Sequence, residues 1–166
     1  MKELTLKQAA EDCRGTLTPE QAEGMITGVQ IDSRRVKPGD LFVAIKGEKS
    51  DGHNFIDMAA SLGAAAALVE RPVKASIPTI LVPDTVKAYG DLAAARRERM
   101  GVTVIGITGS VGKTTTKEMT ACMLERTYRT ARTEGNHNNN IGLPMTILDM
   151  PDDTETAVLE LGMNLS

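Results

Sequence analysis

Hydrophobic residues in the first half of the chain gather into short runs that are separated by polar turns. The runs at residues 41–45, 64–69 and 78–83 have the length and composition of β-strands. Between the first two, residues 55–63 carry apolar side chains at helical spacing and end in a glycine. Strands that alternate with helices predict a small α/β domain, which we place at residues 1–83.

This domain is predicted to begin with a short amphipathic helix. Thr5 and Gln8 have the spacing of a capping box, in which each side chain accepts a hydrogen bond from the other residue's backbone N–H group. One face of the helix is apolar and consists of Leu6, Ala9, Ala10 and Cys13. We therefore expect Cys13 to be a small buried hydrophobic residue rather than a redox group.

A longer helix is expected at residues 84–100, where it would connect the first domain to the second half of the chain. Asp84 is a typical N-cap residue for this helix. The last turn contains Arg96, Arg97 and Arg99, and the helix dipole favours cations at that end. The dipole accounts for these arginines, so the sequence gives no reason to assign them another role.

Three strand-like segments follow, at residues 102–107, about 128–132 and 156–161. The first is a β-branched apolar run of the type found in buried parallel strands. We interpret residues 101–166 as the start of a P-loop-type parallel-sheet domain. We expect this domain to be truncated, because a parallel sheet needs crossover helices on both faces and only three core strands are available.

Composition excludes several classes of function. The chain has 166 residues, a formal net charge of -3, no Trp, two Tyr and two Phe, so it offers neither a basic surface nor an aromatic platform for nucleic acid. No apolar run approaches the roughly 18 residues of a membrane span, and the N-terminus is too polar for a signal peptide. Two cysteines cannot form a disulfide framework. We therefore expect a cytoplasmic protein with no nucleic-acid partner and no membrane insertion.

The strongest chemical signal follows the strand at residues 102–107. Glycines in the segment TGSVGKTTT let the backbone curl so that its N–H groups point at phosphate oxygens, next to the start of a helix. The consensus P-loop has glycine at position 107, where this chain has Ile107, so the loop is a variant. The residues predicted to bind nucleotide phosphates are Gly109, Ser110, Val111, Gly112, Lys113, Thr114 and Thr115.

Two side chains are candidates for holding Mg²⁺. The hydroxyl of Thr114 follows the phosphate-loop lysine, and Glu160 lies near the end of the apolar strand at residues 156–161. On position alone, Glu160 could equally be an acid that points to solvent at a sheet edge. Lys113 and Glu160 are the candidate catalytic residues, because phosphoryl transfer depends on charge neutralisation at the phosphates.

Polar loops supply the remaining candidates. Four asparagines at residues 136–140 are either turn residues or groups that orient a polar substrate. The loops at residues 32–35 and 46–53 contain glycine or short polar side chains, and their residue types favour solvated turns. His53 alone cannot form a zinc site, which needs three or four ligands.

Taken together, these motifs resemble the Mur ligase family, the ATP-dependent amide-forming enzymes of peptidoglycan synthesis. The first half is similar to the family's UDP-binding domain in the segments DSR (32–34), KPGDLFVA (37–44), KG (46–47) and DGHNFI (51–56). The second half is most similar to the members that add D-Ala-D-Ala, in the segments GSVGKTTTKE (109–118), GNHNNNIGLP (135–144) and ELGMN (160–164). The first-half pattern is shared with the ligases that add the third amino acid and does not separate the two groups.

The resemblance implies a reaction and its partners. ATP would transfer its γ-phosphoryl group to the terminal carboxylate of UDP-N-acetylmuramoyl-tripeptide, and the amine of D-Ala-D-Ala would attack the acyl phosphate. Mg²⁺ would assist at Thr114 and Glu160. The residues implied to bind the UDP-linked substrate are Ser33, Arg34, Lys46 and Gly47 at the uridine end, and Asn138 and Asn139 on the muramoyl-peptide side.

The resemblance also predicts that the chain is a fragment that lacks C-terminal parts of the same protein and is inactive alone. Two alternatives remain open at this point. One is a Mur ligase with another acceptor, and the other is a non-catalytic module that binds a UDP-sugar. The third residue of the tripeptide is not determined by these motifs.

Overall fold

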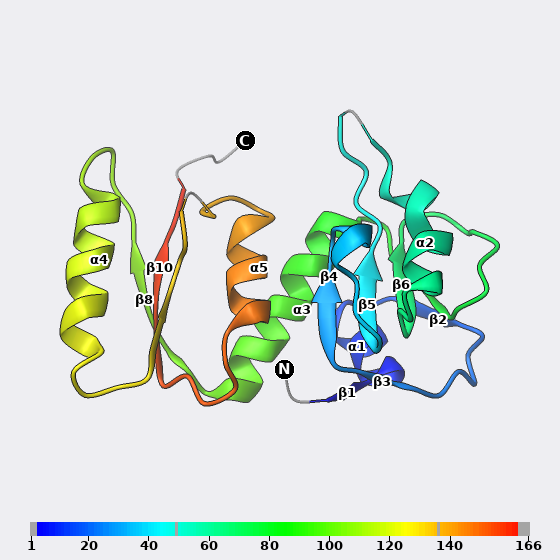
Figure 1. The fold of residues 1–166 in the computed structure, drawn as a ribbon, viewed down its shortest axis with the longest axis horizontal. Helices are drawn as coiled ribbons and strands as arrows, with labels where there is room; N and C mark the ends of the chain where they lie inside the picture. The colour runs from blue at the N-terminus through cyan, green and yellow to red at the C-terminus, as the bar shows by residue number, and fades with distance from the viewer. Residues whose placement is uncertain (1–2, 49, 136, 163–166) are drawn as a thin grey trace. The chain divides into compact units, whose positions relative to one another are not determined.

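The structure is a computed structural model that describes residues 3–48, 50–135 and 137–162 (Figure 1). It divides into two compact units, Met1–Leu92 and Ala93–Ser166. The division falls within helix α3, Thr85–Met100, close to the predicted connecting helix. The predicted domain limits at residues 83 and 101 remain a prediction.

The first unit contains a five-stranded sheet in the order β2-β7-β6-β5-β4. Strand β2 is antiparallel to β7, and the other neighbours are parallel, so the sheet is mixed. A separate pair, β1 (Leu4–Thr5) and β3 (Met25–Ile26), is antiparallel. The strands of the larger sheet are β2 (Thr16–Thr18), β4 (Gly28–Gln30), β5 (Asp40–Val43), β6 (Ala66–Val69) and β7 (Thr79–Leu81).

Helix α2, Ile56–Ser61, forms one core of this unit by packing on the sheet. Phe42 on β5 and Ala67 and Val69 on β6 join Ile56 and Ala59 of the helix in a buried apolar cluster. Every residue of β5 and β6 is buried, which is the pattern of central strands that are covered on both faces. The α/β character predicted for this half is confirmed.

Helix α1, Leu6–Asp12, begins as the sequence predicts. The Thr5 hydroxyl accepts from the Gln8 N–H group at 3.1 Å, and the Gln8 side chain accepts from the Thr5 N–H group at 3.0 Å. The apolar face is buried, including Cys13 just after the helix. Burial raises the pKa of the Cys13 thiol to about 11, which keeps it protonated near neutral pH.

The second unit contains a three-stranded parallel sheet in the order β8-β10-β9. All three predicted strands are present, as β8 (Thr103–Ile107), β9 (Thr130–Arg132) and β10 (Thr156–Glu160). In Figure 1, helix α4 (Lys113–Leu124) and helix α5 (Gly142–Asp149) lie on opposite sides of this sheet. β10 is central and fully buried, so it is the strand that the rest of this unit is built around.

The prediction that residues 102–107 form a buried strand is wrong for the described chain. Most of β8 is exposed or half-buried, and the apolar Val104 keeps 38% of its surface exposed. The physical reason is that, among the described strands, β8 pairs only with β10 and forms an edge of the sheet. β-Branched residues favour the extended backbone of a strand wherever the strand lies. Whether the strand is buried depends on which elements cover it.

Arg96 has a role that the sequence did not reveal. Its side chain is buried, donates from Nε to the Ile147 carbonyl at 3.2 Å, and donates to the Met150 carbonyl. Its guanidinium also pairs with Asp152 at 2.9 Å. It therefore satisfies carbonyl groups near the C-terminal end of α5, a role that the explanation from the helix dipole did not include.

Among the described helices, none combines the length and the apolarity that crossing a membrane would require.

Replacing Arg96 with Met should lower the free energy of unfolding by about 2–3 kcal/mol, because two carbonyl groups lose their donor and Asp152 loses its cation. Urea unfolding followed by circular dichroism measures this change. The matched control is Arg97→Met, whose side chain is 44% exposed, and it should stay within about 0.5 kcal/mol of the parent chain. Equal losses in the two variants would contradict the assignment.

The two cysteines should differ sharply in reactivity. Cys122 is exposed and Cys13 is buried, so a disulfide reagent at pH 8 should modify one thiol quickly and the other only after unfolding. The pKa of Cys13, raised to about 11, leaves almost no thiolate at this pH. Cys122→Ser should abolish the fast phase; two fast-reacting thiols in the folded parent chain would show that α1 is not packed as described.

Candidate functional site

The segment between β8 and α4 curls tightly at two glycines. Gly109 has φ of 150° and Gly112 has φ of 77°, both in the region that side chains with a β-carbon rarely adopt. Gly112 is the N-cap of α4 in the left-handed conformation. In the phosphate loop, residues 109–115, the first four residues therefore form a turn and the last three begin α4, so the turn leads directly into a helix N-terminus, as the motif predicts.

The loop presents free donors and a cation. Within the described part of the chain, the backbone N–H groups of Ser110, Val111 and Gly112 donate no hydrogen bond. The Lys113 ammonium donates to the Gly109 carbonyl at 2.8 Å, so it reaches back over the loop. Unpaired N–H groups at a helix N-terminus, together with an ammonium group, form an arrangement suited to anions.

Thr114 and Glu160 lie in contact although 46 positions separate them in the chain. The Thr114 hydroxyl donates to Glu160 Oε2 at 3.0 Å. The Asn138 amide donates to Glu160 Oε1 at 3.0 Å, so both carboxylate oxygens are engaged. Glu160 is only 3% exposed, which rules out the alternative of an acid that points to solvent.

The parallel sheet explains why these residues meet. Glu160 at the end of β10 pairs in register with Ile107 at the end of β8, and the phosphate loop follows Ile107. Carboxyl ends of parallel strands share one edge of a sheet, which is where ligands of such folds bind. Thr114, in the first turn of α4, is thereby brought beside Glu160.

Close backbone packing places Asn138. The Gly162 N–H group donates to the Asn138 carbonyl at 2.9 Å, and a β-carbon at Gly162 would lie 2.6 Å from that oxygen. A β-carbon at Gly142 would lie 2.5 Å from the Cα atom of His137. Glycine is required at both positions for His137 and Asn138 to lie where they do, next to the end of β10.

Asn139 is engaged differently from its neighbour. Its side-chain oxygen accepts from the N–H groups of Ile141 and Gly142, at 3.0 and 2.7 Å, where α5 begins. These contacts form an Asx turn just before α5, whose N-cap residue is Ile141. Contact of Asn139 with the muramoyl-peptide side of a substrate stays a prediction.

Lys117 joins this cluster and was missed by the sequence analysis. It is 1% exposed, and its ammonium lies 3.9 Å from Glu160 Oε2. The available signal was its spacing, since it stands four residues after Lys113 on the same face of α4.

The oxygen atoms of Thr114 and Glu160 suit Mg²⁺. Among the described residues, no group of three or more His, Cys, Asp or Glu side chains could hold a metal ion alone. Mg²⁺ commonly takes one or two protein oxygens and completes its shell with water and substrate phosphates. The pair therefore fits a metal that is shared with a nucleotide better than a metal held by protein alone.

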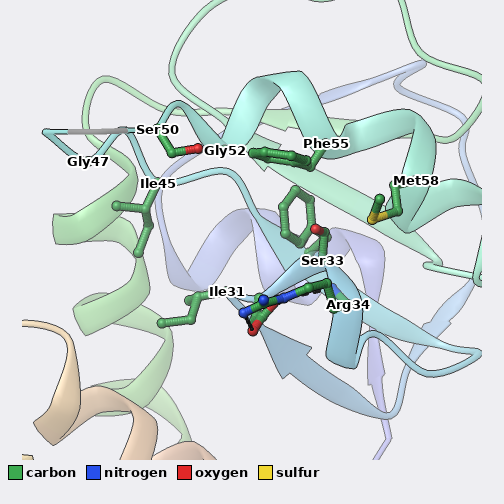
Figure 2. A pocket seen from close by; sticks show the side chains of 11 residues that line it. Ile31, Ser33, Arg34, Ile45, Gly47, Ser50, Gly52, Phe55 and Met58 are labelled. Carbon is green, nitrogen blue, oxygen red and sulfur yellow. Dashed lines mark hydrogen bonds and ion pairs between the residues drawn. The ribbon is translucent and has the colours of Figure 1, made fainter.

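The first unit has a separate cavity of about 540 Å³. Ser33, Arg34 and Gly47, three of the residues implied to bind the UDP end, line it; Lys46 is exposed and does not. Figure 2 shows Phe55 on the opposite side of the cavity from Ser33 and Arg34. The cavity thus combines aromatic and aliphatic walls with a few polar groups, which is typical of small-molecule sites.

Asp32 holds Arg34 at the edge of this cavity. The Arg34 guanidinium donates to both Asp32 carboxylate oxygens, at 2.9 and 2.7 Å. These hydrogen bonds, with one from the Arg34 backbone N–H group, lower the pKa of Asp32 to about 2. The carboxylate therefore stays charged near neutral pH, and Arg34 keeps a defined position although its side chain is 80% exposed.

His53 anchors the loop that forms another wall of the cavity. Its Nε2 atom accepts from the Glu70 N–H group at 3.1 Å, so the proton of the neutral ring sits on Nδ1, 2.7 Å from Asp51 Oδ1. Arg71 also donates to Asp51, and this contact is the main reason that the pKa of Asp51 is well below its usual range. Contacts with Glu70 and Arg71, far along the chain, thus fix the end of this loop at Asp51 and His53, beyond ordinary turn chemistry.

Comparison with known proteins assigns both halves of the chain to one family. Residues 25–103 match a family model described as "Mur ligase family, catalytic domain". Residues 107–166 match a second, described as "Mur ligase middle domain". The two matches together cover most of the chain.

Curated relatives include two enzymes named UDP-N-acetylmuramoyl-tripeptide–D-alanyl-D-alanine ligase. The chain is 46% identical to that of Bacillus subtilis, over 99% of its own length and 37% of the relative. It is 44% identical to that of Escherichia coli, over 99% of its own length and 36% of the relative. The chain therefore spans little more than a third of the length of these relatives.

Solved structures agree. MurF from Acinetobacter baumannii superimposes with a TM-score of 0.92 at 41% identity, covering 99% of this chain and 37% of that one. MurF ligase from Thermotoga maritima in complex with ADP gives a TM-score of 0.75 at 41% identity, covering 80% of this chain and 31% of that one. With both halves matched in sequence and in fold, the chain belongs to the Mur ligase family.

Proposed function

We propose that the chain carries two substrate sites of an ATP-dependent ligase that adds D-Ala-D-Ala to UDP-N-acetylmuramoyl-tripeptide. The observation that carries the proposal is the contact between Thr114 and Glu160 beside the phosphate loop. A hydroxyl beside a buried carboxylate at the start of the phosphate-loop helix supports a site for a nucleotide and its metal ion. The names of the relatives supply the reaction.

The proposed reaction has two steps. The terminal carboxylate oxygen of the tripeptide forms a bond to the γ-phosphorus of ATP, and the bond from that phosphorus to the ADP oxygen breaks. The amine of D-Ala-D-Ala then attacks the acyl carbon, the new amide forms, phosphate leaves and the amine loses a proton. Both steps redistribute negative charge over phosphate oxygens, so fixed donors and cations lower the barrier.

The residues of the second unit divide this work. The free N–H groups of the phosphate loop would bind the phosphates of ATP, with Lys113 neutralising the β- and γ-phosphates. Thr114 and Glu160 would hold Mg²⁺, which when bound supplies positive charge to the phosphate oxygens. Asn138 keeps the Glu160 carboxylate oriented through its amide. Contact of Asn138 with the muramoyl-peptide side is a further part of the proposal.

In the first unit, the cavity would bind the UDP end of the muramoyl substrate. Its volume of about 540 Å³ falls within the range of sites for small ligands. Ser33 is buried in the wall and offers a hydroxyl, and Gly47, which has no side chain, would let a ligand approach the backbone closely. Lys46 is exposed next to Gly47, where its ammonium could meet a diphosphate. We place this reaction in the cytoplasm, where ATP is available.

A non-catalytic module that binds only a UDP-sugar is the second candidate. The observation in its favour is that the first unit is compact and has its own cavity. Separate titrations of the chain with UDP-N-acetylmuramoyl-tripeptide and with MgATP distinguish the two candidates. Binding of both ligands supports the ligase sites, and binding of the UDP-linked ligand alone supports the module.

Lys113→Ala should weaken MgATP binding at least about ten-fold, or about 1.4 kcal/mol, because the ammonium near the phosphates is lost. Calorimetric titration should show unchanged affinity for UDP-N-acetylmuramoyl-tripeptide in the same variant. Lys87→Ala, which removes an exposed ammonium from the other unit, serves as the charge control. Wild-type MgATP affinity in Lys113→Ala would refute the phosphate-site assignment.

A further inference from the structure

Helix α4 carries a second lysine that the phosphate-loop motif does not use. Lys117 is 1% exposed and is among the largest fully buried side chains of the chain. Burial of an ammonium group is costly unless the group is paired and hydrogen-bonded. Its surroundings therefore indicate what the charge does.

Among the described residues, three oxygen atoms lie close to the ammonium of Lys117. It donates to the Thr133 carbonyl at 2.7 Å and lies 3.2 Å from Glu118 Oε1. It lies 3.9 Å from Glu160 Oε2, the oxygen that accepts from the Thr114 hydroxyl. Lys117 thus links the phosphate-loop helix to the carboxylate that the proposed function places at the metal.

Thr133 provides a second connection between the same residues. Its carbonyl accepts from Lys117, and its hydroxyl accepts from the Glu160 N–H group at 3.0 Å. Thr133 directly follows β9 and is fully buried. The end of β9, the end of β10 and the middle of α4 are therefore fastened to one another at this point.

The distances leave Glu160 available to a ligand. A separation of 3.9 Å is too long for a hydrogen bond, so the ammonium attracts Oε2 without occupying its lone pairs. Glu118 lies closer to the ammonium than Glu160 does, and its half-exposed carboxylate, which also pairs with Arg132, balances part of the lysine's charge. Repulsion between Lys117 and an incoming cation is reduced for the same reason.

Stability alone does not require a lysine here. An apolar side chain of similar length could pack α4 on the sheet, and exchanges of buried ion pairs for apolar residues are often neutral for stability. What only the ammonium provides is a fixed electrostatic restraint on Oε2. Groups that orient a metal ligand commonly contribute about 10–100-fold to metal affinity.

We propose that Lys117 is a positioning residue of the nucleotide site. It holds the Glu160 carboxylate against Thr114 and so sets how much Mg²⁺ strengthens the binding of a nucleoside diphosphate. This role rests on the proposed function of the phosphate loop. It predicts a defect that appears only when the metal is present.

The test compares binding of a fluorescent ADP analogue, mant-ADP, in excess Mg²⁺ and in EDTA. In EDTA, Lys117→Met should bind within about two-fold of wild type, and in Mg²⁺ it should bind about ten-fold more weakly. The control Arg126→Met removes an exposed positive charge next to the end of α4 and should match wild type in both conditions. Circular dichroism establishes that each variant is folded.

Each other outcome overturns the inference. Lys117 does not position Glu160 if Lys117→Met and wild type bind mant-ADP equally in both conditions, or if the variant binds more tightly in Mg²⁺. Either result leaves the assignment of the nucleotide site intact. Equal losses in Mg²⁺ and EDTA show a purely structural role. If wild-type binding of mant-ADP does not depend on Mg²⁺, there is no effect of the metal for Lys117 to control. If wild type does not bind mant-ADP at all, the assignment of the nucleotide site fails as well.

A second variant covers the case in which Lys117→Met does not fold. Lys117→Arg keeps the charge but replaces the compact ammonium with a planar group that cannot reproduce the three contacts. In this variant the ratio of mant-ADP affinity in Mg²⁺ to that in EDTA should fall at least about three-fold, and the affinity in EDTA should not change. If this variant keeps the wild-type ratio of affinities, the proposal is also overturned.

Discussion

The buried carboxylate of Glu160 is the constraint on which the second unit depends. A charge that is 3% exposed at the end of a central strand must be paired and hydrogen-bonded, or folding pays several kcal/mol of lost solvation. Here the partners come from two parts of the chain: Thr114 and Lys117 on α4, and Asn138 before α5. Satisfying one carboxylate therefore organises the helix, the asparagine segment and the sheet edge together.

This arrangement connects local backbone geometry to chemistry. Gly112 allows the chain to enter α4 through a left-handed turn, and Gly162 allows the Asn138 backbone to approach the end of β10. Both glycines thereby decide which groups can reach the carboxylate. In the first unit, hydrogen bonds among Asp51, His53 and Arg71 hold the end of a loop that lines the cavity.

Local and periodic features could be predicted from the sequence. The capping box at Thr5, the three parallel strands and the phosphate loop depend on neighbouring residues and on side-chain period, which a sequence displays directly. The contact between Thr114 and Glu160 depends on strand order, because only a central β10 places residue 160 beside the loop. Burial of Arg96 and Lys117 depends on packing partners far along the chain, and the long polar side chains of both residues are ordinarily at the surface.

The most direct test of this account is a double-mutant cycle on MgADP affinity with Thr114→Val and Glu160→Gln. If the hydroxyl and the carboxylate act as one unit, the two losses overlap and the coupling energy is at least about 1 kcal/mol. Losses that add independently would contradict the account, because they would show that the contact at 3.0 Å does not organise the nucleotide site.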